Sequence, residues 1–438
     1  MKALSNEVIV IGAGLAGAEC ALTLSRYGIP VRLIDMKPDK KSPAHSMDTF
    51  CELVCSNSLK SEELSTGSGC LKSELDILGS SVLNIARDCR VPAGSALAVD
   101  RDKFSQAVHK AIIDAGIIVE CRLVDSIARD RLCVIATGPL TDEALSGEIE
   151  SITGTRPYFF DAAAPIVTAD SINMDKAFFG GRYGKGGEDY LNLPMTKDEY
   201  LEFYNALVTA ECVEVKGFES DEIFDGCMPV EVMAKRGEDT LRFGPLRPVG
   251  FRFDGVRPYA VLQLRREDKE GTLYNLVGFQ THLKFLEQKR VFGLIPGLRD
   301  AEFIRYGVMH RNTYINSPSV ITKDLYASAR DNIYFAGQIT GVEGYMESVA
   351  SGLAVALKIV ERLKGVSIDM PTTTVLGALL NYTINGGDSD YQPLNANFGI
   401  LPPLSELIKD KKARKLAYSD RAIRDMKEYR IRRESYGV

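Results

Sequence analysis

The chain of 438 residues lacks several features that mark other classes of protein. No apolar run approaches the roughly 18 residues that a membrane-spanning helix needs, so we expect no membrane segment. The sequence leads straight into the apolar residues 8–11, and we therefore expect no signal peptide. The nine cysteines are an odd number and include no Cys-x-x-Cys pair. This pattern argues against a disulfide framework and against a zinc or other metal site, and it favours the reducing cytoplasm.

Charge of one sign does not dominate the chain either. The formal net charge of −6 argues against a protein whose whole surface is coated with nucleic acid, although a local basic face stays possible. Residues 409–434 are such a stretch, with 11 Lys or Arg against 5 Asp or Glu. They form either a solvated helix face or a contact for phosphate groups, whose affinity would then depend on salt.

A dinucleotide-binding pattern begins near the N-terminus. The β-branched residues 8–11 predict a buried strand, residues 12–17 read GAGLAG, and residues 18–26 predict a helix. Gly12 permits a tight turn, Gly14 lets a pyrophosphate approach the backbone, and Gly17 lets helix and strand pack closely. A second strand, residues 31–35, ends in Asp35, whose carboxylate can bind a ribose hydroxyl. This stretch alone does not distinguish FAD from NAD.

A second glycine turn favours FAD. Residues 332–336 predict a strand that ends in Gly337 and Gln338, and a helix is expected from near Glu343 to Val360. The N-terminus of that helix can face a flavin ribityl chain or a pyrophosphate. A second strand–GxGxxG–helix unit is missing, so we expect no NADPH domain. A nicotinamide reductant, NADPH or NADH, would visit the flavin only transiently.

The length suggests two or three domains, and the pattern of apolar and polar residues changes near residue 158. Strand-like runs at 164–168, 259–264 and 273–278 alternate with loops. We therefore predict an α/β fold: a Rossmann-like FAD-binding domain of the glutathione-reductase type, residues 1–150 and 310–438, with an inserted mixed α/β domain, residues 151–309. The glycine-rich residues 179–189 form either a hairpin loop or a lid.

Asp102 is expected to cap a helix over 103–115.

Two cysteines lie in sequence surroundings that suit a reactive thiol. Cys55 and Cys227 lie among polar residues, glycine or proline, whereas Cys20, Cys121 and Cys133 are interpreted as small buried hydrophobes. Cys55 follows the second strand and is expected near the flavin ring. A flavin-dependent disulfide reductase is an alternative, because Cys51 lies close to Cys55 in the sequence. The missing NADPH domain weakens that alternative.

Six segments resemble the TrmFO family of folate- and FAD-dependent tRNA (uracil-5-)-methyltransferases, smaller relatives of the GidA (MnmG) flavoproteins. They are residues 52–59 (ELVCSNSL), 225–231 (DGCMPVE), 241–249 (LRFGPLRPV), 278–283 (GFQTHL), 306–312 (YGVMHRN) and 336–347 (AGQITGVEGYME). The resemblance runs from end to end of the chain. It implies transfer of a one-carbon unit from 5,10-methylenetetrahydrofolate to C5 of a uridine in the T-arm of tRNA. Reduced FAD would supply the electrons, and NADPH or NADH would recharge it.

The resemblance also implies roles for three residues. Cys227 would add as a thiolate to uracil C6, which turns a poorly nucleophilic C5 into an enolate carbon. Cys55 would remove the C5 proton, and His282 would stack on the folate pterin unless it is a structural histidine. The target uridine would have to flip out of its stack.

Other functions stay open at this point. A paralogue could methylate ribosomal RNA by the same chemistry, a GidA-like enzyme could modify a wobble uridine, and a non-catalytic flavoprotein could merely bind RNA. The local motifs disfavour the GidA-like activity most strongly. The oligomeric state is not predicted.

Overall fold

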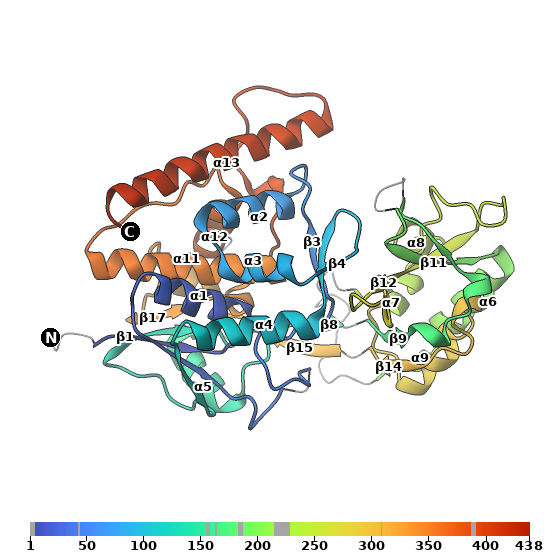
Figure 1. Cartoon of the computed structure of the whole chain (residues 1–438), viewed down its shortest axis with the longest axis horizontal. Coiled ribbons are helices and arrows are strands. Elements are labelled where there is room, and N and C mark those ends of the chain that lie inside the picture. Colours follow the sequence, from blue (N-terminus) through green and yellow to red (C-terminus); the bar gives the residue numbers. More distant parts are fainter. Residues whose placement is uncertain are drawn as a thin grey trace.

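The computed structural model describes residues 5–42, 44–154, 158–162, 164–182, 187–213, 228–307, 309–386 and 391–438. It has two lobes that lie side by side along the long axis (Figure 1). The larger lobe contains both ends of the chain, and the smaller lobe is built from residues in the middle of it. No helix in the described parts combines the length and the apolar character that crossing a membrane requires.

A mostly parallel sheet forms the centre of the larger lobe. Its strand order is β16-β17-β7-β1-β2-β6, and all pairs are parallel except β16 with β17. The strands are β1 (Ser5–Ile11), β2 (Val31–Asp35), β6 (Ile118–Cys121), β7 (Arg131–Ile135), β16 (Tyr326–Ala327) and β17 (Arg330–Phe335). The strand order reverses between β1 and β7, and ligands of such sheets bind at the carboxyl ends of the strands beside that reversal.

Two long helices pack tightly on this sheet and on each other. They are α1 (Leu15–Arg26) and α11 (Tyr345–Lys364), and a Cβ atom on Gly352 would lie only 2.1 Å from the carbonyl oxygen of Ala16. Around them lie α2 (Gly67–Leu78), α3 (Ser81–Asp88), α4 (Arg101–Asp114), α5 (Glu143–Thr153), α10 (Ser317–Val320), α12 (Val375–Asn385) and α13 (Lys411–Ser435). A small sheet of β3 (Ser58–Ser61), β5 (Ala96–Val99) and β4 (Arg90–Val91) lies on the side of the second lobe.

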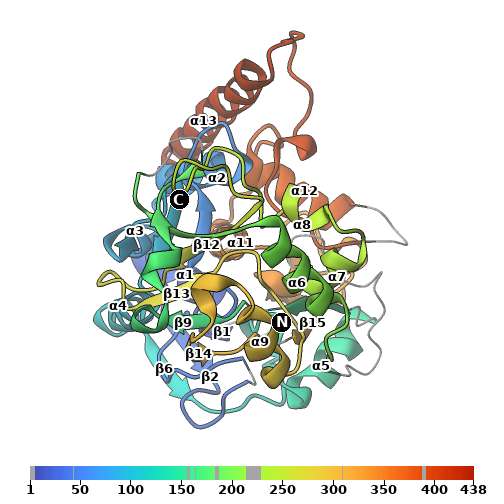
Figure 2. The ribbon, with the colours of Figure 1, turned by 90° about the vertical axis from the view of Figure 1, so that its right-hand side faces the viewer.

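The smaller lobe has an antiparallel sheet covered by helices. The sheet order is β10 (Phe178–Phe179), β11 (Tyr190–Met195), β12 (Ala260–Arg266), β13 (Leu273–Leu276), β9 (Ile166–Thr168) and β14 (Phe303–Arg305). Figure 2 looks onto this lobe and shows α6 (Lys197–Val208), α7 (Val230–Lys235), α8 (Thr240–Phe243) and α9 (Phe285–Phe292). Among the described residues, short 3-10 helices in the smaller lobe are η1 (Ala169–Ser171), η2 (Met174–Lys176) and η6 (Pro296–Leu298), and those in the larger lobe are η7 (Gln338–Thr340) and η8 (Phe398–Ile400).

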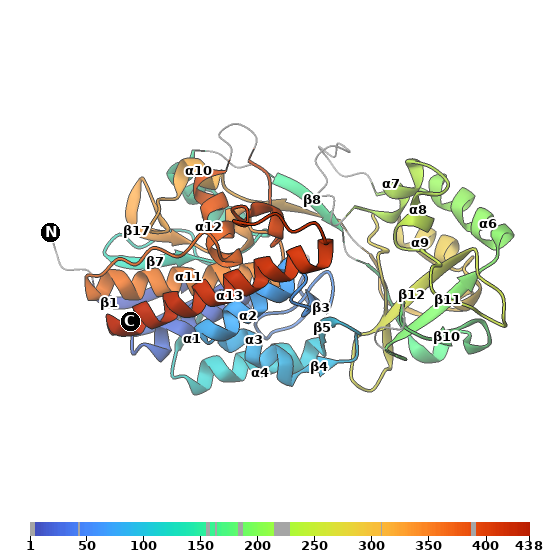
Figure 3. The same cartoon turned by 90° about the horizontal axis from the view of Figure 1, so that it is seen from above.

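The strand pair β8 (Tyr158–Ala162) and β15 (Met309–Thr313) connects the lobes, and Figure 3 shows β8 between them. Each lobe has its own hydrophobic core: one cluster uses residues between 8 and 149 and between 315 and 438, and the other uses residues between 167 and 301. The predicted domain bounds stay a prediction, because two cores do not by themselves show that the units fold independently. The glycine-rich stretch 179–189 lies partly outside the described residues.

Local capping corrects one predicted helix start. The side chain of Asp100, not that of Asp102, accepts the N–H of Lys103, so α4 begins at Arg101. An N-cap residue has extended backbone, and Asp100 has φ −66° and ψ 112°. The prediction that Asp102 caps this helix was therefore wrong by two positions.

Glu74 gives a testable pH dependence of stability. Its buried carboxyl group accepts the N–H groups of Val375 and Leu376, and burial raises its pKa from 4.5 to about 8. Between these values the folded protein holds a proton that the unfolded chain has released. The contribution of Glu74 to stability should therefore be largest below pH 4.5 and should fall as the pH rises to 8, by up to about 1.4 kcal/mol per pH unit.

The Glu74→Gln variant should lack this slope, because a neutral amide has no proton to lose. Urea unfolding at a series of pH values between 5 and 8 measures the slope. The matched control is Glu428→Gln, which changes an exposed carboxylate. An unchanged slope in Glu74→Gln would contradict the assignment.

Candidate active site

The glycine loop after β1 has two positions that admit no side chain and one that is open. Gly12 has φ +99°, and a Cβ atom there would lie 2.5 Å from the carbonyl oxygen of Ala136. A Cβ atom on Gly17 would lie 1.8 Å from the carbonyl oxygen of Gly12, whereas none of the described atoms lies within 4 Å of one built on Gly14. Gly12 and Gly17 thus serve the turn and the packing, and Gly14 leaves space. The cofactor-binding role of all three stays a prediction.

Asp35 holds the same loop from the end of β2. Its Oδ2 accepts the N–H of Ala13 at 2.7 Å, and its Oδ1 accepts the N–H of Lys37 at 2.9 Å. Asp35, Gly12 and Thr137 line a small cavity of about 60 Å³ at the carboxyl ends of β1, β2 and β7. The ribose-binding role of Asp35 stays a prediction.

The starts of α1 and α11 suit an anionic ligand. Each begins after a glycine, Gly14 or Gly344, which offers no side chain to bind the free N–H groups of the first turn. The other described helices of ten or more residues begin at a Thr or Asp whose side chain accepts such an N–H; these residues are Thr66, Asp100, Asp142, Thr196, Thr374 and Asp410. The uncapped N–H groups fit the phosphates of a dinucleotide such as FAD.

The second glycine turn lies beside the first. Gly337 has φ +83°, and a Cβ atom there would lie 2.7 Å from Cβ of Ala16 in α1. Its N–H donates to Oγ of Ser351, and the side-chain amide of Gln338 donates to Glu343. Two segments that are about 320 residues apart in the sequence therefore meet at one edge of the sheet. That FAD contacts Gly337 and Gln338 stays a prediction.

Cys55 lies against the first residue of α11. Its Sγ is 3.0 Å from Oη of Tyr345, and its N–H donates to the same oxygen at 3.0 Å. Burial raises the pKa of Tyr345 well above its usual value, so the phenol stays protonated near neutral pH and can donate to a thiolate. The predicted reactive cysteine thus lies at the start of the helix predicted to face the flavin.

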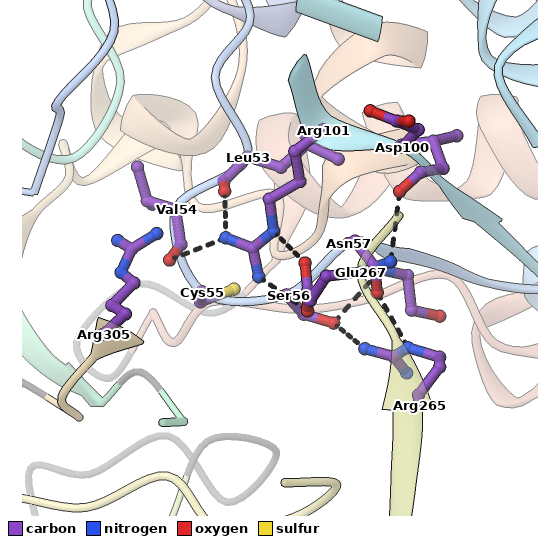
Figure 4. A network of polar contacts seen from close by, with 12 residues as sticks. Leu53, Val54, Cys55, Ser56, Asn57, Asp100, Arg101, Arg265, Glu267 and Arg305 are labelled. Carbon is purple, nitrogen blue, oxygen red and sulfur yellow. Dashed lines mark hydrogen bonds and ion pairs between the residues drawn. The ribbon is translucent and has the colours of Figure 1, made fainter. Parts of the chain in front are cut away.

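Arginines from both lobes fix the loop that carries Cys55 (Figure 4). Arg101, the first residue of α4, donates to the carbonyl oxygen of Leu53 at 2.6 Å and binds both carboxylate oxygens of Glu267 in the smaller lobe. Arg265 on β12 donates to Oδ1 of Asn57 and to Oγ of Ser56, each at 2.7 Å. This network joins the lobes next to the thiol.

The charge around Cys55 is mainly positive. Burial lowers the pKa values of Arg265 and Arg305, yet guanidinium groups remain charged at physiological pH. Figure 4 shows Arg305 and Arg265 on two sides of the Cys55 loop, with Arg101 between them. Nearby cations favour the thiolate form of a cysteine. The site therefore suits a thiolate base or an anionic substrate.

Cys51 does not form a redox pair with Cys55 in this structure. Both are free cysteines, and Cys51 is buried, with its Sγ facing the carbonyl oxygen of Ala13. Burial raises the pKa of the Cys51 thiol far above its usual value. The geometry gives the disulfide-reductase alternative no support. Cys20 and Cys133 are buried as expected, but Cys121 is exposed, so its interpretation as a buried hydrophobe was wrong.

The other two predicted site residues stand apart from this network. Cys227 lies outside the described residues. His282 lies in the smaller lobe, where its Nδ1 is 2.5 Å from Oε1 of the fully buried Glu231. Burial lowers the pKa of His282, but the hydrogen bonds that its ring donates to Cys212 and Glu231 outweigh burial and raise the pKa to about 9. Its predicted contact with the pterin stays a prediction.

Sequence reasoning gave no role to Tyr345, Arg101, Arg265 or Glu267. Tyr345 lies inside the quoted segment 336–347, so its place beside a motif was the available signal. The partners Arg101 and Glu267 are 166 residues apart, and no local pattern in the sequence marks them.

Comparison with known proteins identifies close relatives. The family model described as "Glucose inhibited division protein A" matches residues 7–367. A protein of Caldicellulosiruptor bescii is 52% identical over 96% of this chain and 98% of its own length. One of Desulfitobacterium hafniense is 53% identical over 97% of this chain and 98% of its own length. Both are named "Methylenetetrahydrofolate--tRNA-(uracil-5-)-methyltransferase TrmFO".

A solved structure supports the fold. Aquifex aeolicus GidA superposes with a TM-score of 0.70 over 98% of this chain and 75% of that chain, at 14% sequence identity. At this identity the likeness shows the fold alone. It confirms the predicted α/β fold class with a Rossmann-like FAD-binding domain.

Proposed function

The chain belongs to the TrmFO family of methylenetetrahydrofolate–tRNA-(uracil-5-)-methyltransferases, and from this we propose that it methylates C5 of a T-loop uridine in tRNA. The observation that carries the proposal is identity above 50% to two named relatives over nearly the whole chain. The methyl carbon comes from 5,10-methylenetetrahydrofolate. The reaction takes place in the cytoplasm, and NADPH or NADH reduces the flavin.

The residues that would hold FAD are those of the two glycine turns. Gly12, Gly14 and Gly17 shape the first turn, Asp35 binds the ribose, and the N–H groups at the starts of α1 and α11 bind phosphates. Gly337 and Gln338 would contact the flavin part of the bound cofactor. Bound FAD, when reduced, supplies the hydride that converts an exocyclic methylene on uracil to a methyl group.

We assign the first covalent step to Cys227. Its thiolate forms a bond to C6 of the flipped uracil, and the electron pair of the C5=C6 double bond becomes available at C5 as an enolate. C5 then bonds to the methylene carbon of the folate substrate. Loss of the C5 proton frees one electron pair, which expels the tetrahydrofolate amine and leaves an exocyclic methylene on a uracil that is still bonded to Cys227 through C6. Hydride addition to that methylene would return an electron pair to C5, and this pair would expel the Cys227 thiolate and restore the C5=C6 double bond.

We assign removal of the C5 proton to Cys55. The support is its position: three arginines surround its loop, and the hydroxyl of Tyr345 lies 3.0 Å from its sulfur. The cations and the hydroxyl stabilise a thiolate, which is the basic form. Arg101 acts as a positioning residue, because it binds the loop carbonyl at Leu53 and is itself held by Glu267. His282 is kept as the proposed pterin contact.

Label transfer tests the proposal directly. Purified protein is incubated with NADPH, methylenetetrahydrofolate labelled in the methylene group, and either a tRNA transcript or a ribosomal RNA fragment. We expect label in tRNA at the T-loop uridine, and none in a transcript with cytidine at that position. Label in the ribosomal fragment instead would favour the rRNA paralogue, and label in neither RNA would reject the proposal.

Replacing Tyr345 by Phe should slow methyl transfer about tenfold, because a hydrogen bond of about 1.4 kcal/mol to the Cys55 thiolate is lost. The pH at which activity reaches half its maximum should also move upward, since the thiolate is less stabilised. Single-turnover rates across pH measure both effects. Tyr436→Phe, which changes an exposed tyrosine, is the matched control. An unchanged pH profile would argue against Tyr345 as a positioning residue for Cys55.

A further inference from the structure

Three metal-ligand side chains converge in the smaller lobe. Cys212 follows α6, Glu231 is the second residue of α7, and His282 lies between β13 and α9. One ligand atom from each, the thiol sulfur, a carboxylate oxygen and an imidazole nitrogen, lies within 4.8 Å of the other two. Glu231 and His282 are 19 and 70 residues after Cys212, so no short spacing in the sequence marks this cluster.

Backbone pairing and hydrogen bonds hold the three residues next to one another. Cys212 forms a β-bridge with Leu283, and the N–H of Val213 donates to the carbonyl oxygen of His282 at 2.8 Å. The carboxylate of Glu231 accepts the hydroxyl of Thr281 at 2.7 Å and the N–H of His282 at 2.8 Å. Hydrogen bonds of this kind orient the ligands of known metal sites. The cluster is therefore ordered before any ion binds.

We propose that Cys212, Glu231 and His282 bind one divalent transition metal ion of the class of Zn²⁺. A mixed set of sulfur, nitrogen and oxygen suits Zn²⁺, whereas Ca²⁺ and Mg²⁺ prefer oxygen ligands alone. Three protein ligands leave one tetrahedral position for water. The site shares His282 with the proposed pterin contact, but it includes neither Cys55 nor the glycine turns, and its tests measure thiol labelling and metal content rather than methyl transfer.

A bound metal ion would occupy the place of the proton between His282 and Glu231, and it would not need an existing cavity. The 2.5 Å between Nδ1 of His282 and Oε1 of Glu231 is a hydrogen-bond length. Two such ligands of a tetrahedral Zn²⁺ lie about 3.3 Å apart, so the atoms must separate by less than about 1 Å. The ion takes the place of the proton between His282 and Glu231, and both that proton and the thiol proton of Cys212 pass to solvent.

The position of the cluster gives the ion a structural role. In the sequence, Cys212 precedes and Glu231 follows residues 214–227, the stretch that ends in Cys227. A metal ion bound to both would cross-link the chain between these two positions, as a disulfide does.

Alkylation of the full-length holoprotein tests the site without mutation. Iodoacetamide labelling of Cys212 is followed by peptide mass spectrometry with and without Zn²⁺, and exposed Cys121 is the internal control. We expect Zn²⁺ to slow labelling of Cys212 by about tenfold or more, because a metal-bound thiolate is not free to react. Labelling of Cys121 should not change. Equal labelling of Cys212 with and without Zn²⁺ would overturn the proposal.

Metal content gives the second measurement. After dialysis against Zn²⁺ and removal of loosely bound ion, the protein should retain one Zn²⁺ per chain, and the X-ray absorption edge should show a single sulfur ligand. Cys212→Ser should lose the ion, whereas Cys121→Ser should keep it. Retention of Zn²⁺ by Cys212→Ser would overturn the proposal. Absence of stoichiometric Zn²⁺ from the unchanged protein would overturn it too, and would mean that a proton holds the three side chains together. Neither measurement depends on methyl transfer.

Discussion

Replacing Cys227 by Ala is expected to lower methyl transfer to tRNA by on the order of 10³-fold or more. Without the thiolate, uracil C6 gains no nucleophile, and C5 stays too electron-poor to attack the methylene of the folate. FAD should remain bound, because the two glycine turns lie in the larger lobe. The measurement is transfer of labelled carbon to tRNA, together with the flavin absorbance of the purified variant.

A trapping experiment separates the nucleophile from the base. A tRNA carrying 5-fluorouridine has no C5 proton to remove, so the adduct formed by the nucleophile should persist as a covalent protein–RNA complex. We expect that complex with Cys55→Ala but not with Cys227→Ala. Cys121→Ala, at the exposed cysteine, is the matched control. Full activity in Cys227→Ala, or a complex that still forms, would reject the assignment.

Short-range sequence patterns predicted the geometry of the glycine turn after β1 well. The turn at Gly12, the packing at Gly17 and the open side at Gly14 depend on residues within one strand–turn–helix unit. The position of Asp35 follows from the pairing of β2 with β1. The prediction that Asp102 caps α4 failed, because backbone geometry selects the cap and the sequence alone does not show that Asp100 has the extended backbone a cap needs.

Contacts between distant segments could not be predicted in the same way. Tyr345 reaches Cys55 across 290 residues, and Glu267 reaches Arg101 across 166. Each side chain alone is an ordinary tyrosine, glutamate or arginine, and its role appears only when the lobes are assembled. The cluster of Cys212, Glu231 and His282 is of this kind too. The expectation of no metal site was based on the spacing of the cysteines, and that spacing carries no information about ligands from distant segments.

The lobes meet where the thiol chemistry is proposed, and this has an energetic consequence. Arg101 and Glu267 are both largely buried, with side-chain exposures of 11% and 4%. Removing one partner of such a pair costs about 3–5 kcal/mol, because the other charge stays buried. The same contact that orients the Cys55 loop therefore also holds the smaller lobe against the larger one.

Changing Gly14 to Asp should reduce FAD affinity by at least about 100-fold while leaving the apoprotein as stable as before. The backbone of Gly14 has φ −72° and ψ −174°, which any residue can adopt, and a Cβ atom there meets none of the described atoms. Aspartate is also a favourable N-cap, so α1 should gain a few tenths of a kcal/mol. The new carboxylate, however, would accept the N–H groups that otherwise bind a phosphate. Its charge would also repel that phosphate, and the repulsion would weaken the binding free energy by about 3–4 kcal/mol.

Two neighbouring variants make this result specific. Gly14→Ala adds no charge and should weaken FAD binding less, whereas Gly17→Ala forces a Cβ atom to within 1.8 Å of the carbonyl oxygen of Gly12 and should destabilise the apoprotein itself. FAD titration of the apoproteins measures affinity, and their thermal unfolding measures stability. If Gly14→Asp bound FAD as tightly as the unchanged chain, the pyrophosphate could not lie at the start of α1. A much larger loss of FAD affinity in Gly14→Asp than in Gly14→Ala, with the apoprotein still stable, would support a negatively charged group of the ligand at that helix end.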